Sequence, residues 1–145
     1  MEFTKSGLII FRPMQKTDEP FLFTTWLNGM YYGTDTVRKF YDTIDIPKDQ
    51  FFKKYHKVIE IILDCPSVKV NVAVLKEDED VILGYCVTDT IDNEPTLHYV
   101  FVKPAWRKMG LAKEMIPKDI TRCTHLTKVG RIIKPKEWTY SPFYT

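Results

Sequence analysis

The sequence predicts an α+β fold in which antiparallel strands are combined with helices in one domain. Two helix patterns precede three consecutive strand patterns, and no change in composition marks a linker. The chain has 145 residues, of which 44% are hydrophobic and 28% charged, as in a globular protein with one core. We therefore expect residues 1–145 to form a single domain.

The first half of the chain is expected to contain one strand and two helices. The apolar run at residues 8–11 indicates a strand. Residues 17–18 can cap an aromatic-rich helix that stops near the glycines at 29–33, and residues 31–35 are expected to form a loop. A second helix begins at Pro47. Its apolar residues recur every three or four positions, which gives it one broad apolar face.

Three strands are expected in the middle of the chain. In residues 68–74 valines alternate with other residues, which is the period of a strand. An acidic turn at residues 76–80 joins this strand to a second one over residues 81–88, and the two form a hairpin. After another turn, a third strand covers residues 96–102. The three strands are therefore consecutive and antiparallel.

The last third of the chain has less regular patterns. A helix is expected over residues 108–116, with a continuation to Ile120 after a kink at Pro117. The tail is expected to hold a strand at 121–126, a helical turn at 129–133 and a final strand at 138–140.

The overall charge gives little indication of a partner. The net charge is +2, so no strong field indicates a nucleic acid or a membrane. A group of basic residues in the second half would either meet an anionic ligand or form a solvated face. Its members are Arg122, Lys128, Arg131, Lys134 and Lys136.

Location and redox state are inferred from features that the sequence lacks. The first residues contain no apolar run of the kind found in secretion signals, and the longest apolar stretches are too short to span a bilayer. The cysteines at 65, 86 and 123 lack the spacing of a disulfide framework or a zinc site. We therefore expect a cytoplasmic protein with reduced thiols, no bound metal and no membrane contact.

The most informative segment joins the 96–102 strand to the following helix. Unpaired N–H groups at the start of a helix attract an anion such as a pyrophosphate. Gly110 has no side chain that would hold the anion away, Ala112 keeps the next turn slim, and Arg107 and Lys108 add positive charge. The other interpretation is structural, since Gly110 would also let a helix pack tightly on a sheet.

This segment resembles the signature of the GNAT superfamily of acyl-CoA N-acyltransferases, which is (Arg/Gln)-x-x-Gly-x-(Gly/Ala) after a fourth strand. The six matching positions are Arg107, Lys108, Met109, Gly110, Leu111 and Ala112. The order of elements over residues 8–126 is similar too. The resemblance implies a GNAT-like, mixed but mainly antiparallel central sheet flanked by helices. It also implies that acetyl-CoA is the co-substrate and that the acetyl group is transferred to an amine.

The resemblance further implies how the cofactor binds. The backbone amides of residues 109–112 would hold the pyrophosphate. In this family a bulge separates the fourth strand from the fifth, and the free edges of Val100 and Val102 would pair with the pantetheine amides in that opening. An amide N–H near Val100 would then lie where the thioester oxygen gains charge.

Three residues are candidates for moving protons. An amine must be neutral to attack the thioester, but an alkyl ammonium has a pKa of roughly 10.4, so a base that removes its proton is useful. His98 stands where members similar to the arylalkylamine type carry a catalytic histidine; the other interpretation is a strand histidine with a structural hydrogen bond. Many members place an acid two residues earlier, where this chain has Thr96. Tyr140 and Tyr144 are candidate donors to the departing thiolate, although the tail matches the family poorly and both tyrosines suit packing.

The acceptor pocket of such folds is lined by the loop between the first two helices, where Tyr31, Tyr32 and Asp35 are expected. Asp35 would hold a cationic amine, or it would simply cap a helix. The acceptor itself is expected to be a small-molecule or protein amine.

Two alternatives remain open from the sequence. One keeps the fold without catalysis, as a binding or regulatory protein, because the acid is absent and the tail is short. The other is a nucleic-acid-directed protein, similar to phage DNA-modification proteins of this fold, because the tail is basic and contains Trp138 and Tyr140. The low net charge argues against the second. Free strand edges in the tail would allow a homodimer.

Overall fold

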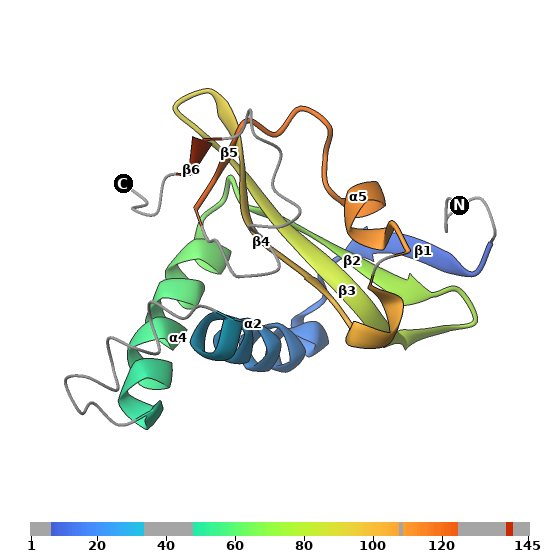
Figure 1. Cartoon of the computed structure of the whole chain (residues 1–145), viewed down its shortest axis with the longest axis horizontal. Helices are drawn as coiled ribbons and strands as arrows, with labels where there is room; N and C mark the ends of the chain where they lie inside the picture. The colour runs from blue at the N-terminus through green and yellow to red at the C-terminus, as the bar shows by residue number, and fades with distance from the viewer. Residues whose placement is uncertain (1–6, 34–47, 108, 125–138, 141–145) are drawn as a thin grey trace.

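The computed structural model describes residues 7–33, 48–107, 109–124 and 139–140 (Figure 1). The elements in chain order are β1 (Ile9–Pro13), η1 (Lys16–Asp18), α2 (Glu19–Gly33), α4 (Lys48–Asp64), β2 (Lys69–Leu75), β3 (Asp78–Ile91), β4 (Glu94–Val102), η2 (Pro104–Trp106), α5 (Leu111–Met115), β5 (Arg122–Cys123) and β6 (Thr139–Tyr140). No helix among these residues combines the length and apolar character needed to cross a membrane.

The strands form one sheet in the order β1-β2-β3-β4-β5-β6. Neighbouring strands from β1 to β4 are antiparallel, whereas β5 is parallel to β4 and β6 is parallel to β5. This arrangement confirms the mixed, mainly antiparallel sheet flanked by helices that the sequence predicts. The consecutive hairpins explain the order of the first four strands, because each short turn returns the chain beside the strand that it has just left.

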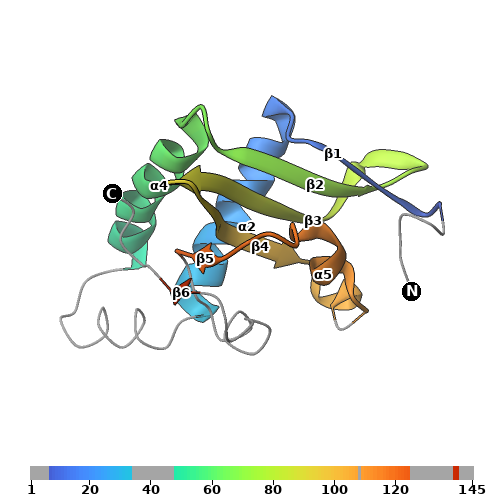
Figure 2. The same cartoon turned by 90° about the horizontal axis from the view of Figure 1, so that it is seen from above.

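Hydrophobic side chains pack against both faces of the sheet. Helices α2 and α4 cover one face, and the short helix α5 lies on the other (Figures 1 and 2). Val72 and Val74 of β2 point into the core beneath α2 and α4, and Ala73 between them points into the core beneath α5. This alternation follows from the period of two in a strand. The valine pattern at 68–74 therefore marks a strand that is buried on both sides.

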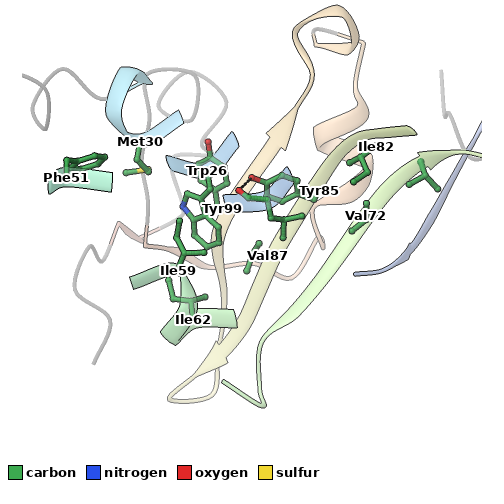
Figure 3. Close-up of a cluster of buried hydrophobic side chains, with 12 residues drawn as sticks. Trp26, Met30, Phe51, Ile59, Ile62, Val72, Ile82, Tyr85, Val87 and Tyr99 are labelled. Atoms are coloured by element: carbon green, nitrogen blue, oxygen red, sulfur yellow. Dashed lines mark hydrogen bonds between the residues drawn. The ribbon is translucent and has the colours of Figure 1, made fainter. Parts of the chain in front are cut away.

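The larger core is rich in aromatic side chains. Figure 3 shows Trp26 of α2 beside Tyr99 of β4, with Ile59 and Ile62 of α4 below them. The rings of Trp26 and Tyr99 are stacked, with centroids 5.0 Å apart and planes 6° apart. Stacking of this kind adds to the stabilisation that burial of the two rings provides.

The hairpin between β2 and β3 differs from the prediction. The turn contains only Lys76 and Glu77, because Leu75 already pairs with Asp78. The acidic residues 78–80, expected in the turn, extend β3 instead, and their side chains are exposed. Charged residues are tolerated there because this end of the strand faces solvent. The second strand is therefore longer than the predicted 81–88.

The helix boundaries also differ in two places. Helix α2 continues to Gly33, so the prediction of a loop beginning at residue 31 was wrong. Helix α5 begins at Leu111 rather than at residue 108, and it ends at Met115 without continuing to Ile120. The late start has a local cause: Gly110 has a φ of 88°, a left-handed conformation that is incompatible with an α-helix.

The other predictions for the tail are met in part. Strand β5 contains Arg122 and Cys123 of the predicted 121–126, and β6 contains Thr139 and Tyr140 of the predicted 138–140; residues 125, 126 and 138 lie outside the described part of the chain. The helical turn expected at 129–133 lies outside the described residues.

Candidate functional site

The carboxyl half of β4 presents backbone groups at its edge away from β3. The N–H of Lys103 donates to the carbonyl of Leu83 (2.8 Å), which makes Gly84 and Val102 a pair that is not joined by hydrogen bonds. Val100, two residues earlier, forms with Cys86 another pair that is not joined by hydrogen bonds. The N–H and C=O groups of Val100 and Val102 therefore both point away from β3.

Strand β5 covers only the first half of that edge. Its ladder with β4 consists of Thr96 and Leu97 within the described residues, and the N–H of Thr124 adds a hydrogen bond to the carbonyl of Leu97 (3.1 Å). Beyond this point β4 runs toward α5 and β5 runs toward α2 and α4 (Figure 1). The described part of β5 therefore makes no pair with β4 from Val100 onward, and we call the region beside this part of the β4 edge the split.

Arg107 lies at the carboxyl end of the split. Its Nε donates to the carbonyl of Val102 (2.7 Å), and its guanidinium lies 5.8 Å from the centre of the Phe101 ring. A cation over an aromatic face is stabilised by the ring quadrupole. The side chain of Arg107 is therefore held at the end of β4, where it occupies one of the backbone acceptors that face the split.

The turn before α5 has an open space above its glycine. A Cβ added to Gly110 would meet no atom within 4 Å, although its φ of 88° favours glycine. The side chain of Leu111 is buried in the core beneath α5 and so fixes the turn against the sheet. The first N–H groups of α5 have no acceptor within the helix. Because α5 has only five residues, these amides, rather than the helix dipole, would bind an anion.

A β-bulge in β4 centres on His98. Val87 pairs with Tyr99, and the next residue of β3, Thr88, pairs with Leu97, so His98 is the extra residue. In a regular strand Leu97 and Tyr99 would face the same side of the sheet. Because of the bulge they face opposite sides: Tyr99 lies in the core beneath α2 and α4, and Leu97 lies in the core beneath α5. The change of phase lies where β4 and β5 begin to separate.

The imidazole of His98 is fully buried and has a polar partner at each nitrogen. Its exposed fraction is 0%. Nδ1 lies 2.8 Å from the hydroxyl of Thr124, and Nε2 lies 3.4 Å from a carboxylate oxygen of Asp89. Burial lowers the pKa of His98 below its ordinary 6.5, Asp89 partly opposes this effect, and the charge of Arg122 adds to it. This environment suits a neutral imidazole and favours the structural interpretation of His98 over direct contact with an acceptor.

The structure brings the other candidates together only in part. Tyr31 lies on α2 and packs against Phe51 and Phe52 of α4, with ring centroids 5.3 and 5.6 Å apart. It belongs to a contact between helices rather than to a loop. Tyr32 is also in α2, and Tyr140 pairs with Cys123 in the β5–β6 ladder. Lys108, Asp35 and Tyr144 lie outside the described residues.

One member of the basic group is engaged inside the protein. The guanidinium of Arg122 donates to the carbonyl of Ile91 (2.8 Å) and to the hydroxyl of Thr96 (3.3 Å), and it lies 3.6 Å from Glu94. The other four members lie outside the described residues. Among the described residues, no group of three or more His, Cys, Asp or Glu side chains could hold a metal ion.

Two residues of this site, Asp89 and Thr124, were missed from the sequence. Both are buried, and both contact His98. The predicted second strand ended at residue 88 and the following turn was placed at residues 92–95, so Asp89 was assigned to neither. An acidic residue next to an apolar strand would have been the only available signal, because the contact between β3, β4 and β5 is tertiary.

Comparison with known proteins identifies a related family. The sequence model of the acetyltransferase (GNAT) family matches residues 23–133. A comparison with curated proteins found no match.

Several solved structures resemble the chain in shape. A possible acetyltransferase from Clostridium difficile 630 is 16% identical, with 80% of this chain and 77% of that one covered and a TM-score of 0.48. The aminoglycoside N-acetyltransferase AAC(6')-Iy, solved in complex with CoA, is 19% identical, with 94% and 93% covered and a TM-score of 0.46.

A third similarity involves only part of a larger protein. The glucosamine N-acetyltransferase region of a fungal multi-domain beta-N-acetylglucosaminidase is 18% identical, with a TM-score of 0.47. This comparison covers 74% of the present chain but only 11% of the fungal one. At these identities and TM-scores, none of the three structures defines a substrate for this chain.

Proposed function

The chain belongs to the acetyltransferase (GNAT) family, and from this premise we propose that it transfers an acetyl group from acetyl-CoA to an amine. The observation that carries the proposal is the orientation of Val100 and Val102, whose backbone groups point into the split between β4 and β5. An extended ligand arm with amide groups can pair with such an edge as an added strand would. The pantetheine arm of CoA has this chemistry.

The turn at residues 109–112 is the proposed site of the pyrophosphate. Gly110 leaves the space above the turn open, and the first amides of α5 supply donors. Lys108 and Arg107 would add positive charge. If pantetheine uses the carbonyl of Val102, its amide N–H replaces the Nε of Arg107 there, which would release the guanidinium for the ligand.

In the proposed reaction, a neutral amine attacks the thioester carbonyl, and the N–H near Val100 stabilises the charge that develops on the oxygen. The C–S bond then breaks, and Tyr140 or Tyr144 would protonate the thiolate. Tyr31, Tyr32 and Asp35 are the proposed lining of the acceptor pocket. His98 is the proposed base, and its burial requires that it acts through a neighbouring group.

Thermal unfolding with and without acetyl-CoA tests the cofactor site. At about a hundred times the dissociation constant, the ligand adds about 2.7 kcal/mol, which raises the melting temperature by several degrees. We expect this shift in the wild type and its loss in Gly110→Glu, because a carboxylate there would repel and obstruct the pyrophosphate.

Gly7→Glu is the matched control for this measurement. Gly7 also has a positive φ (75°) and open space around its Cβ position, but it lies before β1 at the other edge of the sheet. We expect this variant to keep the shift. A wild type that millimolar acetyl-CoA does not stabilise would contradict the proposal, as would a Gly7→Glu variant that loses the shift together with Gly110→Glu.

The burial of His98 favours one second candidate, a GNAT-fold protein that binds a ligand without catalysis. It predicts stabilisation by acetyl-CoA without release of free thiol in the presence of any amine. A nucleic-acid-directed role predicts instead a complex with DNA or RNA that weakens steeply as salt increases. If no complex forms at low salt, this role is excluded.

A further inference from the structure

Three buried polar side chains form a chain across β3, β4 and the end of β5. Asp89 of β3 lies 3.4 Å from Nε2 of His98, and Nδ1 of His98 lies 2.8 Å from the hydroxyl of Thr124. All three residues are at most 5% exposed. Buried polar groups are costly unless they are paired, so three in a row across three strands require an explanation beyond packing.

The direction of each hydrogen bond follows from the chemistry of the groups. A carboxylate only accepts, so the hydrogen between Asp89 and His98 belongs to Nε2. In a neutral imidazole Nδ1 then carries no hydrogen, so the hydroxyl of Thr124 must donate its hydrogen to Nδ1. The other carboxylate oxygen of Asp89 accepts from the N–H of Thr90 (2.7 Å), which fixes the plane of the carboxylate.

Thr124 is the member of this chain that lies at the split. Within the described residues, its N–H makes the last hydrogen bond from the β5 segment to β4, at Leu97, and Val100 lies three residues further along β4. The β-bulge places His98 between these two residues, with its ring toward Asp89 and Thr124. The backbone partner of Thr124, Leu97, thus lies three residues before Val100, where the thioester is proposed to lie.

We propose that Thr124, His98 and Asp89 form a proton relay that deprotonates the acceptor amine during acetyl transfer. The inference rests on the proposed function. As the C–N bond forms and the C–S bond breaks, the proton of the attacking nitrogen passes to the oxygen of Thr124. The original hydroxyl proton of Thr124 passes to Nδ1 of His98. The thiolate leaves with the electron pair of the C–S bond and takes a proton from Tyr140 or Tyr144, which solvent then reprotonates.

This relay explains how His98, which has no exposed surface, can act as a base. Thr124 contacts the acceptor, His98 holds the proton, and Asp89 is a positioning residue that fixes the imidazole tautomer. When His98 becomes an imidazolium, both partners of its Nε2–H bond to Asp89 are charged, and such ion-paired hydrogen bonds are short. The present 3.4 Å separation leaves room for that shortening.

Other charged groups face the relay and influence its pH dependence. Arg122 of the β5 segment contacts Thr96 in β4, and Glu94 at the start of β4 lies 3.6 Å from it. The charge of Arg122 disfavours protonation of His98, whereas Asp89 favours it. Arg122, Glu94 and Asp89 are all unchanged when Thr124 is substituted, so that only the hydroxyl is altered.

The test measures free thiol released from acetyl-CoA with a polyamine, an arylalkylamine, a lysine peptide, an aminoglycoside, or water alone. Thr124→Val is nearly isosteric and lacks the hydroxyl. We expect it to lower kcat by about 10²-fold or more, the usual size of a general-base effect, with little change in KM for acetyl-CoA. Thr124→Ser should retain activity within about tenfold, because it restores the hydroxyl. Thr121→Val, which removes an exposed hydroxyl nearby, should be unchanged.

The pH profile separates a relay from a structural role. In the wild type, kcat should rise with pH as His98 becomes neutral, and this rise should be absent in Thr124→Val. Asp89→Asn should lower kcat and shift the midpoint of the rise, because Asn removes the charge that stabilises the imidazolium. Near-UV circular dichroism, which reports the stacked Trp26 and Tyr99, checks that each variant is folded.

Nitrogen NMR of the wild type provides a test that needs no turnover. We expect the Nε2–H tautomer for His98, with the resonance assigned by its loss in His98→Gln. The Nδ1–H tautomer would overturn the relay. So would wild-type activity in folded Thr124→Val, or the absence of thiol release from a wild type that acetyl-CoA stabilises. Absence of stabilisation by acetyl-CoA would overturn the proposed function as well, so the two failures are distinguishable.

Discussion

Arg12 and Asp18 show how one pair of residues holds the amino-terminal part of the chain on the sheet. The guanidinium of Arg12 donates to both carboxylate oxygens of Asp18, at 2.7 and 3.1 Å, and to the carbonyl of Glu79 (3.1 Å). Asp18 also accepts from the N–H of Gln15 (2.8 Å). The hydrogen bonds from Arg12 lower the pKa of Asp18, and burial partly opposes them. Thr17 or Asp18 was predicted to cap α2, but the side chain of Asp18 belongs to this ion pair.

We expect Asp18→Asn to lower the free energy of unfolding at pH 7 by about 2–4 kcal/mol, because it removes the buried carboxylate that hydrogen-bonds the guanidinium and leaves the exposed Glu79 (3.7 Å) to pair with it. The folded-state pKa of Asp18 lies below the ordinary 3.8, so the contribution is present above that value and is lost as pH falls through the folded-state pKa. Urea unfolding at pH 7 and near pH 3 measures this difference.

The exposed residue Asp119 provides the control for this comparison. Asp119→Asn should change stability by less than about 0.5 kcal/mol. An Asp18→Asn effect that stays constant down to pH 2 would show that the ion pair is not its source.

Helix α4 illustrates how a periodic pattern determines an element and its orientation. Its apolar residues recur every three or four positions, and three of them, Phe51, Ile59 and Ile62, are buried. Exposed lysines at 53, 54 and 57 cover the opposite face. His56 lies at the border between the two faces, where its ring stacks on Phe23 of α2 and its Nδ1 lies 3.1 Å from Glu60. Because the helical period determines which face is apolar, the sequence alone predicts which side of α4 meets the sheet.

Two isoleucines of α4 give a matched pair for measuring this burial. Ile59 is 0% exposed and Ile61 is 65% exposed. We expect Ile59→Ala to lower the free energy of unfolding by about 2–5 kcal/mol, since it removes buried methyl groups and leaves a cavity. Ile61→Ala should have an effect of less than about 0.5 kcal/mol. Similar losses in both variants, measured by chemical denaturation, would contradict the assigned orientation of α4.

At the scale of the whole molecule, the sheet separates two cores, and contacts across the larger core join segments far apart in sequence. Tyr99 of β4 stacks on Trp26 of α2 (Figure 3). Its hydroxyl also lies against Gly29 of the same helix. Gly29 is unfavourable within a helix, but a Cβ there would collide with the hydroxyl of Tyr99. The glycine therefore allows α2 to approach β4 closely.

We expect Gly29→Ala to lower the free energy of unfolding by about 1–3 kcal/mol, although alanine favours a helix by about 1 kcal/mol. In a Tyr99→Phe background the hydroxyl is absent, so the cost should fall by about 1 kcal/mol or more. A double-mutant cycle by urea unfolding measures this coupling. Equal costs in the two backgrounds would mean that the contact between Gly29 and Tyr99 does not limit the approach of α2.

The site could be predicted only as far as local patterns extend. Residues 107–112 stand out in the sequence because a glycine follows basic residues between a strand and a helix, and Gly110 indeed has an unusual conformation and open space. The orientation of Val100 and Val102 depends on the register between β3 and β4, which no single segment specifies. Which backbone groups of a strand face away from its neighbour can be determined only when the pairing of the strands is known.

Short-range patterns in the sequence were sufficient for the α+β class, the consecutive antiparallel strands, the main helices and the family to which the chain belongs. The period of side chains along a strand or helix is a local property, so it can be read without a structure. The resemblance implied a bulge and free edges at Val100 and Val102, but the position of the bulge at His98 and the chain from Asp89 through His98 to Thr124 were decided only by the tertiary structure. Each of these features depends on how strands distant in sequence pair, and the energy that fixes that pairing comes from the packed cores on both faces of the sheet.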